Sequence, residues 1–262
     1  GPTNSEAFKI AGKEAVLDDN DDVVRPDTRQ FITPIDGDTT VLSKNTSQIR
    51  ATLNTTTIAE GGGGSTVAIG ASIAFNSVGV DSQNVLFNLA DTFAGTFVAD
   101  LKPSKATARV ARSTVDVAHD LIVEAENVTV IDAEIQNAAV ATGVSLADQS
   151  KAVSVGVIIA LNRTDSDTEA QIADSTNIVS RAGAITVSAE DISIIDAEVT
   201  AASMSASVGK GGSKAVSIAA SFARNEITSD ATAEILRSDV AAETNITVDA
   251  QRNAQINARG LS

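Results

Sequence analysis

The feature that most constrains this chain is a repeat of about sixty residues in which large apolar and small side chains alternate. Lys151 and Lys214 lie 63 residues apart, and Ile131 and Ile195 lie 64 apart. A fixed period, with turn residues at matching positions in each unit, indicates an array of structural repeats. Three segments share length, alternation and a final asparagine: VAIGASIAFN (67–76), VSVGVIIALN (153–162) and VSIAASFARN (216–225).

Alternation with a period of two predicts β-strands rather than helices. Val153 and Val155 alternate with Ser154 and Gly156, and turn residues as in LNRTDSD (161–167) mark the boundaries. Units of this kind cannot bury an apolar face alone, so neighbouring units must stack. We therefore expect an all-β fold, a parallel β-solenoid wound as a right-handed β-helix, with two or three coils of roughly twenty to thirty residues per repeat. A sandwich of the same strands is the competing fold.

In the segment GGGGSTVAIGASIAFN (61–76), the side chains at alternate positions differ most in size. We call the set of larger side chains the large parity and expect it to face the solenoid interior: Val67, Ile69, Ala71, Ile73 and Phe75. A solvated face would usually carry Lys, Glu or Thr, whereas the other parity is small throughout. We expect this small face to be covered at close range by a helix, another sheet or another chain. Its members are Ala68, Gly70, Ser72 and Ala74, which recur as Ser217, Ala219, Ser221 and Ala223.

Two segments depart from the repeat. The insertion SQNVLFNLADTFAGTFVADL (82–101) carries apolar residues at intervals of three and four, which predicts an amphipathic helix over about 82–101. We expect this helix to cover a hydrophobic surface or a strand edge. The alternative is a docking element for another chain. Phe87 lies off the main apolar stripe of the helix. Residues 1–45 match the repeat poorly, which predicts an atypical N-terminal segment before a solenoid domain at 46–262. That segment is a cap, a linker or a partly ordered approach to the first coil.

Residues suited to catalysis do not cluster in the sequence. The single histidine, His119, precedes Asp120, a pairing that can orient a general base, but its place near an expected turn favours an exposed turn histidine. Tyr and Trp, the usual platforms for sugar rings, are absent. The carboxylates recur from unit to unit, which favours a structural role or a solvated face: Glu126, Asp132 and Glu134, then Glu190, Asp196 and Glu198. We assign no catalytic, cofactor-binding or metal-binding residue and expect no enzyme.

Calcium is the one cofactor that the sequence suggests. LDDNDDVV (17–24) gathers Asp18, Asp19, Asn20, Asp21 and Asp22, and hard cations take oxygen ligands. The run lacks the spacing of an EF-hand loop and of the calcium β-roll nonapeptide, so a solvated acidic turn is the favoured interpretation. The glycine stretches 61–64 and 209–212 precede strand-like sequence, which predicts turns, because a phosphate loop needs a following helix.

The composition limits the kinds of partner that this chain can bind. The net charge of −15 and the pI near 4.4 argue against nucleic acid and anionic membrane surfaces. No apolar run is long enough to span a bilayer, so no membrane insertion is expected. The absence of cysteine excludes disulfides and thiol chemistry. Gly1-Pro2 resembles a remnant of protease cleavage, so we expect an excised fragment whose export signal lies outside it.

The alternating Ala, Val and Ser runs, with VSVGVIIALN, AQIADST (170–176) and AITVSAED (184–191), resemble the repeats of giant bacterial surface proteins of the haemagglutinin or RTX-adhesin type, over about residues 45 to 258. The resemblance implies an extended, stiff, non-catalytic scaffold, extracellular or on the cell surface, for adhesion or self-association. The expected partners are neighbouring repeats, a second copy, or a surface glycan or protein receptor. The alternatives are a polysaccharide-binding or polysaccharide-degrading β-helix module and a subunit of an ordered assembly.

Overall fold

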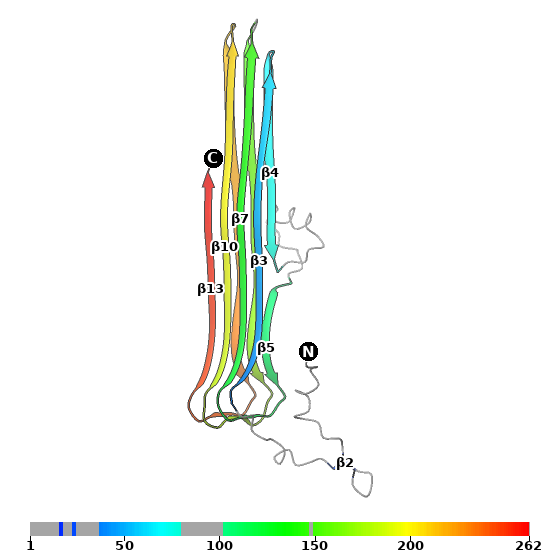
Figure 1. Cartoon of the computed structure of the whole chain (residues 1–262), viewed down its shortest axis with the longest axis vertical. Helices are drawn as coiled ribbons and strands as arrows, with labels where there is room; N and C mark the ends of the chain where they lie inside the picture. The colour runs from blue at the N-terminus through cyan, green and yellow to red at the C-terminus, as the bar shows by residue number, and fades with distance from the viewer. Residues whose placement is uncertain (1–15, 18–22, 25–36, 80–101, 147–148, 262) are drawn as a thin grey trace.

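The computed structural model describes residues 16–17, 23–24, 37–79, 102–146 and 149–261, and every regular element among them is a strand. Long strands run side by side along a tall, narrow blade, and the chain turns at its two ends (Figure 1). One sheet is parallel throughout, in the order β13-β10-β7-β3. Its strands are β3 (Thr39–Gly61), β7 (Leu121–Ser145), β10 (Ile185–Gly209) and β13 (Ile246–Leu261).

The second sheet lies against the first and has the order β11-β8-β4. Its strands are β4 (Ser65–Val78), β8 (Ser150–Ala173) and β11 (Ser213–Leu236), and β5 (Ser104–Ala111) pairs with the far end of β8. A third, short sheet closes the base with β6 (Val115–Val117), β9 (Ile178–Ser180) and β12 (Val240–Ala242). Separately, β1 (Val16–Leu17) pairs with β2 (Val23–Val24) in antiparallel fashion.

Each repeat is a single long coil. The chain climbs the blade in β7, turns at the tip, descends in β8, crosses the base in β9 and begins the next coil in β10. The expected parallel β-solenoid is confirmed, but the expected coil length of twenty to thirty residues was wrong. A period-two pattern does not reveal where a strand must turn, and these strands reach 25 residues because only the tip and the base interrupt them. Right-handed winding stays a prediction.

The register of the repeats follows the sequence alignment. Lys151 pairs with Lys214, and Ile131 pairs with Ile195. The final asparagines stack into a ladder: Asn76 Nδ2 donates to Asn162 Oδ1 at 2.8 Å, and Asn162 Nδ2 donates to Asn225 Oδ1 at 2.7 Å. Identical residues recur at each level because parallel, in-register stacking gives every level the same surroundings.

The interior changes character along the blade. Near the base the space between the sheets holds large, fully buried side chains such as Leu121, Ile172 and Ile185. Towards the tip the buried apolar residues are only alanines, Ala68, Ala141 and Ala152. The blade is therefore thick and conventionally packed at its base and filled by small side chains at its tip.

A polar layer crosses the core between these regions, centred on the fully buried Asp191. Its carboxylate accepts hydrogen bonds from Asn127 Nδ2 at 3.2 Å, Ser166 Oγ at 3.0 Å, Thr168 Oγ1 at 3.0 Å and Ser193 Oγ at 2.9 Å. These four donors come from three different strands, so the layer joins the two sheets and two successive coils. A buried carboxylate needs such partners to remain in the core.

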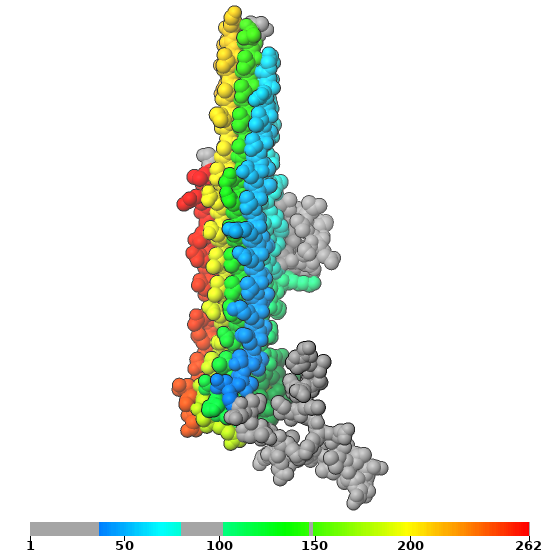
Figure 2. Space-filling view, in the orientation of Figure 1, coloured from blue at the N-terminus to red at the C-terminus, as the bar shows by residue number. Residues whose placement is uncertain are grey.

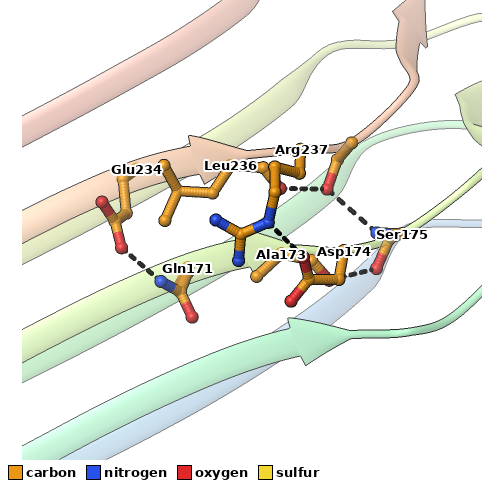
Figure 3. A network of polar contacts seen from close by, with 8 residues as sticks. Gln171, Ala173, Asp174, Ser175, Glu234, Leu236 and Arg237 are labelled. Atoms are coloured by element: carbon orange, nitrogen blue, oxygen red, sulfur yellow. Dashed lines mark hydrogen bonds and ion pairs between the residues drawn. The ribbon is translucent and has the colours of Figure 1, made fainter.

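The corners at the base repeat as well (Figure 3). Arg112, Asp174 and Arg237 each follow a descending strand with positive φ values of 49°, 49° and 44°. The next residue in each coil is a serine, and Ser175 Oγ donates to the Ala173 carbonyl while Ser175 N–H donates to Ser238 Oγ. Arg237 Nε bonds Asp174 Oδ1 at 2.5 Å, which lowers the pKa of Asp174. The corners thus add one polar ladder that runs from coil to coil.

The two ends of the coiled region have different surroundings. At the N-terminal end β3 begins at Thr39, which pairs in register with Leu121. At the other end, β13 reaches only part of the height of β10 (Figure 2). Ile246 and Ile256 face the interior there but stay exposed, since the opposite sheet ends at β11 among the described residues. The expected helix at 82–101 and the acidic run 18–22 lie outside the described residues.

Candidate interaction surface

The outer surface of the β11-β8-β4 sheet carries the large side chains near the tip. Val67, Ile69 and Ile73 are 56, 66 and 53% exposed, whereas Ala68 and Ser72 on the same strand are buried. The expectation that the large parity of 61–76 faces the interior was therefore wrong. Alternation shows that the two faces differ, but the distance between the sheets decides which face can turn inwards.

Towards the tip from Ile158, which is fully buried, the sheets approach each other closely. A β-carbon on Gly70 would stand 2.7 Å from Asn137 Oδ1, and one on Gly156 would stand 2.8 Å from the Ala202 carbonyl oxygen. Hydroxyls meet across the gap: Thr55 Oγ1 and Ser72 Oγ are 2.5 Å apart. The expectation that the small parity is covered at close range is confirmed on β4, where its cover is the opposite sheet. On β11 it holds only in part, because Ser217 and Ala223 are exposed.

The outward side chains form in-register rows across the three strands. Val67, Val153 and Val216 make one row. The rows continue towards the base, with the β8 members half-buried between their neighbours on β4 and β11. We call this set the aliphatic face: Val67, Ile69, Ala71, Ile73, Val153, Val155, Val157, Ile159, Val216, Ile218, Ala220 and Phe222.

The aliphatic face is comparable in area with the largest apolar patch of a typical monomeric protein. Strands about 4.8 Å apart and rows about 6.8 Å apart give the four rows an area on the order of 400 Å². Apolar patches of this size on soluble proteins are often functional. β-branched side chains dominate the face and are stiff, so ordering them against a partner costs little conformational entropy.

Charges border the face on both sides. Lys151 and Lys214 form the row nearest the tip. On the side of the base, Arg224 lies in the bordering row and Arg163 lies beside Glu226 in the next, followed by Asp167 and Glu169. A hydrogen bond between Lys105 Nζ and Asp167 Oδ2, at 2.7 Å, raises the pKa of Lys105.

Asp165 lies among these charges and is only 5% exposed. It stands beside the point where the chain leaves β4 at Gly79, whose ideal β-carbon would meet the Asp165 carbonyl. Asp165 Oδ2 has no hydrogen-bond partner, and burial raises the pKa of the carboxyl. The nearby acids Asp167 and Glu226 raise it further, while Arg163 opposes them.

The opposite outer surface, on the β13-β10-β7-β3 sheet, is polar towards the base. The carboxylates that recur in the sequence stack there in register, Glu126 beside Glu190 and Asp132 beside Asp196. The edge strand supplies counter-charges, with Lys44 Nζ 2.6 Å from Glu126 Oε2 and Arg50 Nε 3.1 Å from Asp132 Oδ2. Of the structural role or solvated face expected for these residues, both occur: Glu126 and Asp132 are half-buried and ion-paired, and Glu190 and Asp196 are exposed.

The structure places His119 at an exposed bend before β7. Its carbonyl accepts a hydrogen bond from Ser180 Oγ at 2.6 Å. The Asp120 carboxylate accepts from the Ala184 N–H at 2.7 Å, so it ties this corner to the next coil. The exposed turn histidine is confirmed.

Glycine stretches 61–64 and 209–212 lie at the tip and connect strands of the two sheets, as predicted for turns. Across the described residues, no three His, Asp or Glu side chains converge to hold a metal ion. No helix with the length and apolar character needed to cross a membrane occurs in the part of the chain that the structure describes. No family model, curated protein or solved structure matches the chain.

The sequence contained a signal for the inverted face that alternation alone concealed. Lys151 shares its parity with Val153, and Lys214 shares its parity with Val216. Because lysine is almost never buried without a partner, this parity belongs on the outside. The ladder residue Asn162 belongs to the small parity, which is consistent with a hydrogen-bonded interior position.

Proposed function

We propose that this chain is a stiff, non-catalytic structural segment of a large bacterial surface or secreted repeat protein, and that it presents the aliphatic face for adhesion or self-association. The observation that carries the proposal is the inverted tip, where the small side chains fill the interior and the large ones face outwards. In a chain selected only for stability those large side chains would be buried, because each Å² of apolar surface removed from water adds about 25 cal/mol to the free energy of unfolding. Their exposure on three in-register strands is the arrangement of a contact surface.

The internal ladders support the stiff scaffold. The asparagine ladder, the Asp191 layer and the corner serines all join successive coils. Each coil is therefore tied to its neighbour at several heights, and bending the blade would break many contacts together. The resemblance to repeats of bacterial adhesins supports the same function and an extracellular or cell-surface location.

Adhesion through the aliphatic face can be tested with two matched variants. Ile69→Lys places a charge in the face, and Leu42→Lys places the same charge at a similarly exposed site, 57% against 66%, on the opposite sheet, where its row neighbour is Glu124. We expect the parent protein and Leu42→Lys to adsorb to alkyl-coated beads and Ile69→Lys to adsorb at least tenfold less. Equal adsorption of all three would contradict the proposal.

The same samples, incubated with a panel of polysaccharides, separate a scaffold from a polysaccharide-degrading module. We expect no increase in reducing ends and no unsaturated products absorbing in the ultraviolet. Turnover of any polymer would show that the chain is an enzyme and would contradict the proposed non-catalytic scaffold.

A further inference from the structure

We propose that the open end of the solenoid binds one extended strand of a separate polypeptide, parallel to β11 and in register with it. The open end is the surface formed by the free edge of β11 and the inward face of β13. This surface is distinct from the aliphatic face, so the inference goes beyond the proposed function. It is carried by the exposed interior of β13, by the direction of two polar ladders and by the charges along β11.

The space beside β11 is one strand wide. Within the described residues the first sheet reaches β13, whereas the second sheet stops one strand earlier, at β11. The inward side chains Ile246, Val248 and Ile256 are therefore 47, 46 and 46% exposed. The residues that pair with them on β10 are 0% exposed: Ile185, Val187 and Ile195. A strand added beside β11 would stand opposite β13 and cover these side chains.

Two polar ladders indicate that the added strand has the chemistry of this repeat. Asn162 Nδ2 donates to Asn225 Oδ1, so the Nδ2 donor of Asn225 faces the next position in the stack. At the corner Ser175 N–H donates to Ser238 Oγ, so the N–H of Ser238 faces that position too. An asparagine and a serine in register would supply the two acceptors.

The outward charges along the free edge of β11 select the sequence that fits. In order from tip to base they are Lys214, Arg224, Glu226, Asp230 and Glu234. A bound strand therefore needs cations near the base, beside the last two acids, and no cation beside Lys214 or Arg224. Complementary charges at these rows fix the register of the added strand.

The strands β4 and β5 show how such a sequence binds, because they already pair with β8, the neighbour of β11. Lys105 on β5 lies with its Nζ 2.7 Å from Asp167 Oδ2, and Asp167 pairs with Asp230. The same sequence placed one level further would set Lys105 beside Asp230 and Arg109 beside Glu234.

The other rows of that alignment carry no like charges. Ser65 would lie beside Lys214, Phe75 beside Arg224 and Ser77 beside Glu226, while Asn76 would continue the asparagine ladder.

The interior of the open end also admits this sequence. Ser104 would take the place beside Ser229, whose carbonyl accepts a hydrogen bond from Arg252 Nη1 at 2.9 Å. The inward charge of Arg252 would thus meet a hydroxyl. Ala108, which packs in the core of its own coil, is small enough to lie against Val248. Backbone pairing along an exposed sheet edge supplies the affinity, and the alternate side chains supply the specificity.

A synthetic peptide tests the inference directly. Its sequence is residues 65–79 followed by residues 104–111, with a fluorescent label at one end. Because β4 ends opposite Thr164 and β5 begins opposite Ser166, Gly79 alone spans the one position between them. We expect saturable binding to the whole chain by fluorescence anisotropy, and at least tenfold weaker binding of a peptide with the same composition in shuffled order.

Charge reversal tests the register. The peptide with Lys105→Glu and Arg109→Glu should bind the parent protein at least tenfold more weakly, and the protein variant Asp230→Lys/Glu234→Lys should restore its binding. The matched protein control is Glu190→Lys/Glu198→Lys, which makes the same change of charge on the other sheet and should leave binding of the original peptide unchanged. Reversal without restoration would overturn the proposed register.

Hydrogen exchange locates the bound peptide. We expect slower amide exchange on β11 and β13. Slower exchange on β8 with faster exchange on β4 would mean that the peptide displaces β4, and that result would overturn the open end as the site. Absence of saturable binding, or equal binding of the shuffled peptide, would overturn the inference as a whole.

Discussion

The β-carbon that Gly156 lacks would lie 2.8 Å from the carbonyl oxygen of Ala202 on the opposite sheet. The obstacle is backbone, which cannot move aside as the end of a side chain can. This contact sets the narrow spacing of the tip and, through it, the outward direction of the large side chains.

Enlarging Gly156 should therefore force the sheets apart. We expect Gly156→Val to lower the free energy of unfolding by about 1–3 kcal/mol, the usual cost of overpacking. Ala71→Val, an outward position on β4, should change it by less than about 0.5 kcal/mol. Urea denaturation measures both, and equal stability of the two variants would contradict the close approach.

Asp191 should hold the two sheets together at the polar layer. Asp191→Ala leaves four buried donors without their acceptor, and we expect a loss of about 2–4 kcal/mol. Glu190→Ala removes a carboxylate from the neighbouring outward position and should cost less than about 0.5 kcal/mol. The comparison uses chemical denaturation at neutral pH, and a small effect of Asp191→Ala would show that the layer is replaceable.

The asparagine ladder should stabilise the stack of coils. Asn162→Ala breaks the hydrogen bonds to Asn76 and Asn225, and we expect a cost of about 1–3 kcal/mol. Asn54→Ala, at an exposed outward position, is the matched control and should be near neutral. Amide hydrogen exchange should become faster on β4, β8 and β11 in Asn162→Ala. Faster exchange confined to residue 162 would argue against a ladder.

Two aspartates should respond to pH with opposite sign. The pKa of Asp174 is lowered by Arg237, so its stabilisation is present above the ordinary carboxyl pKa of about 3.8 and is lost as pH falls through the lower folded value. The pKa of Asp165 is raised by burial, so its penalty appears as pH rises above about 3.8 and is complete above the raised folded value.

At pH 7 we therefore expect Asp174→Asn to lower the melting temperature and Asp165→Asn to raise it. Each kcal/mol corresponds to roughly 2–4 °C for a chain of this size. Melting curves from pH 3 to pH 7 should show both differences shrinking towards the acid end. Differences that stay constant with pH would point to packing rather than charge.

The strands, the repeat and the register could all be predicted from the amino-acid sequence. Strict alternation defines strands locally, and residues such as Lys151 and Lys214 recur because each coil meets the one before it in register. The solvated carboxylates and the turn at His119 follow from the same periodicity, because positions that recur at equivalent heights share one environment.

Only the tertiary structure decided the length of each coil and the side to which the large residues turn. Both depend on the distance between two sheets whose residues lie far apart in the chain, as Gly156 and Ala202 do. Near the base that distance admits Ile172 and Ile185, and near the tip most of the buried side chains are small, although Ile158 is fully buried behind the lower part of the aliphatic face. The large side chains turn outwards because the close approach of the sheets at Gly70 and Gly156 leaves little room inside.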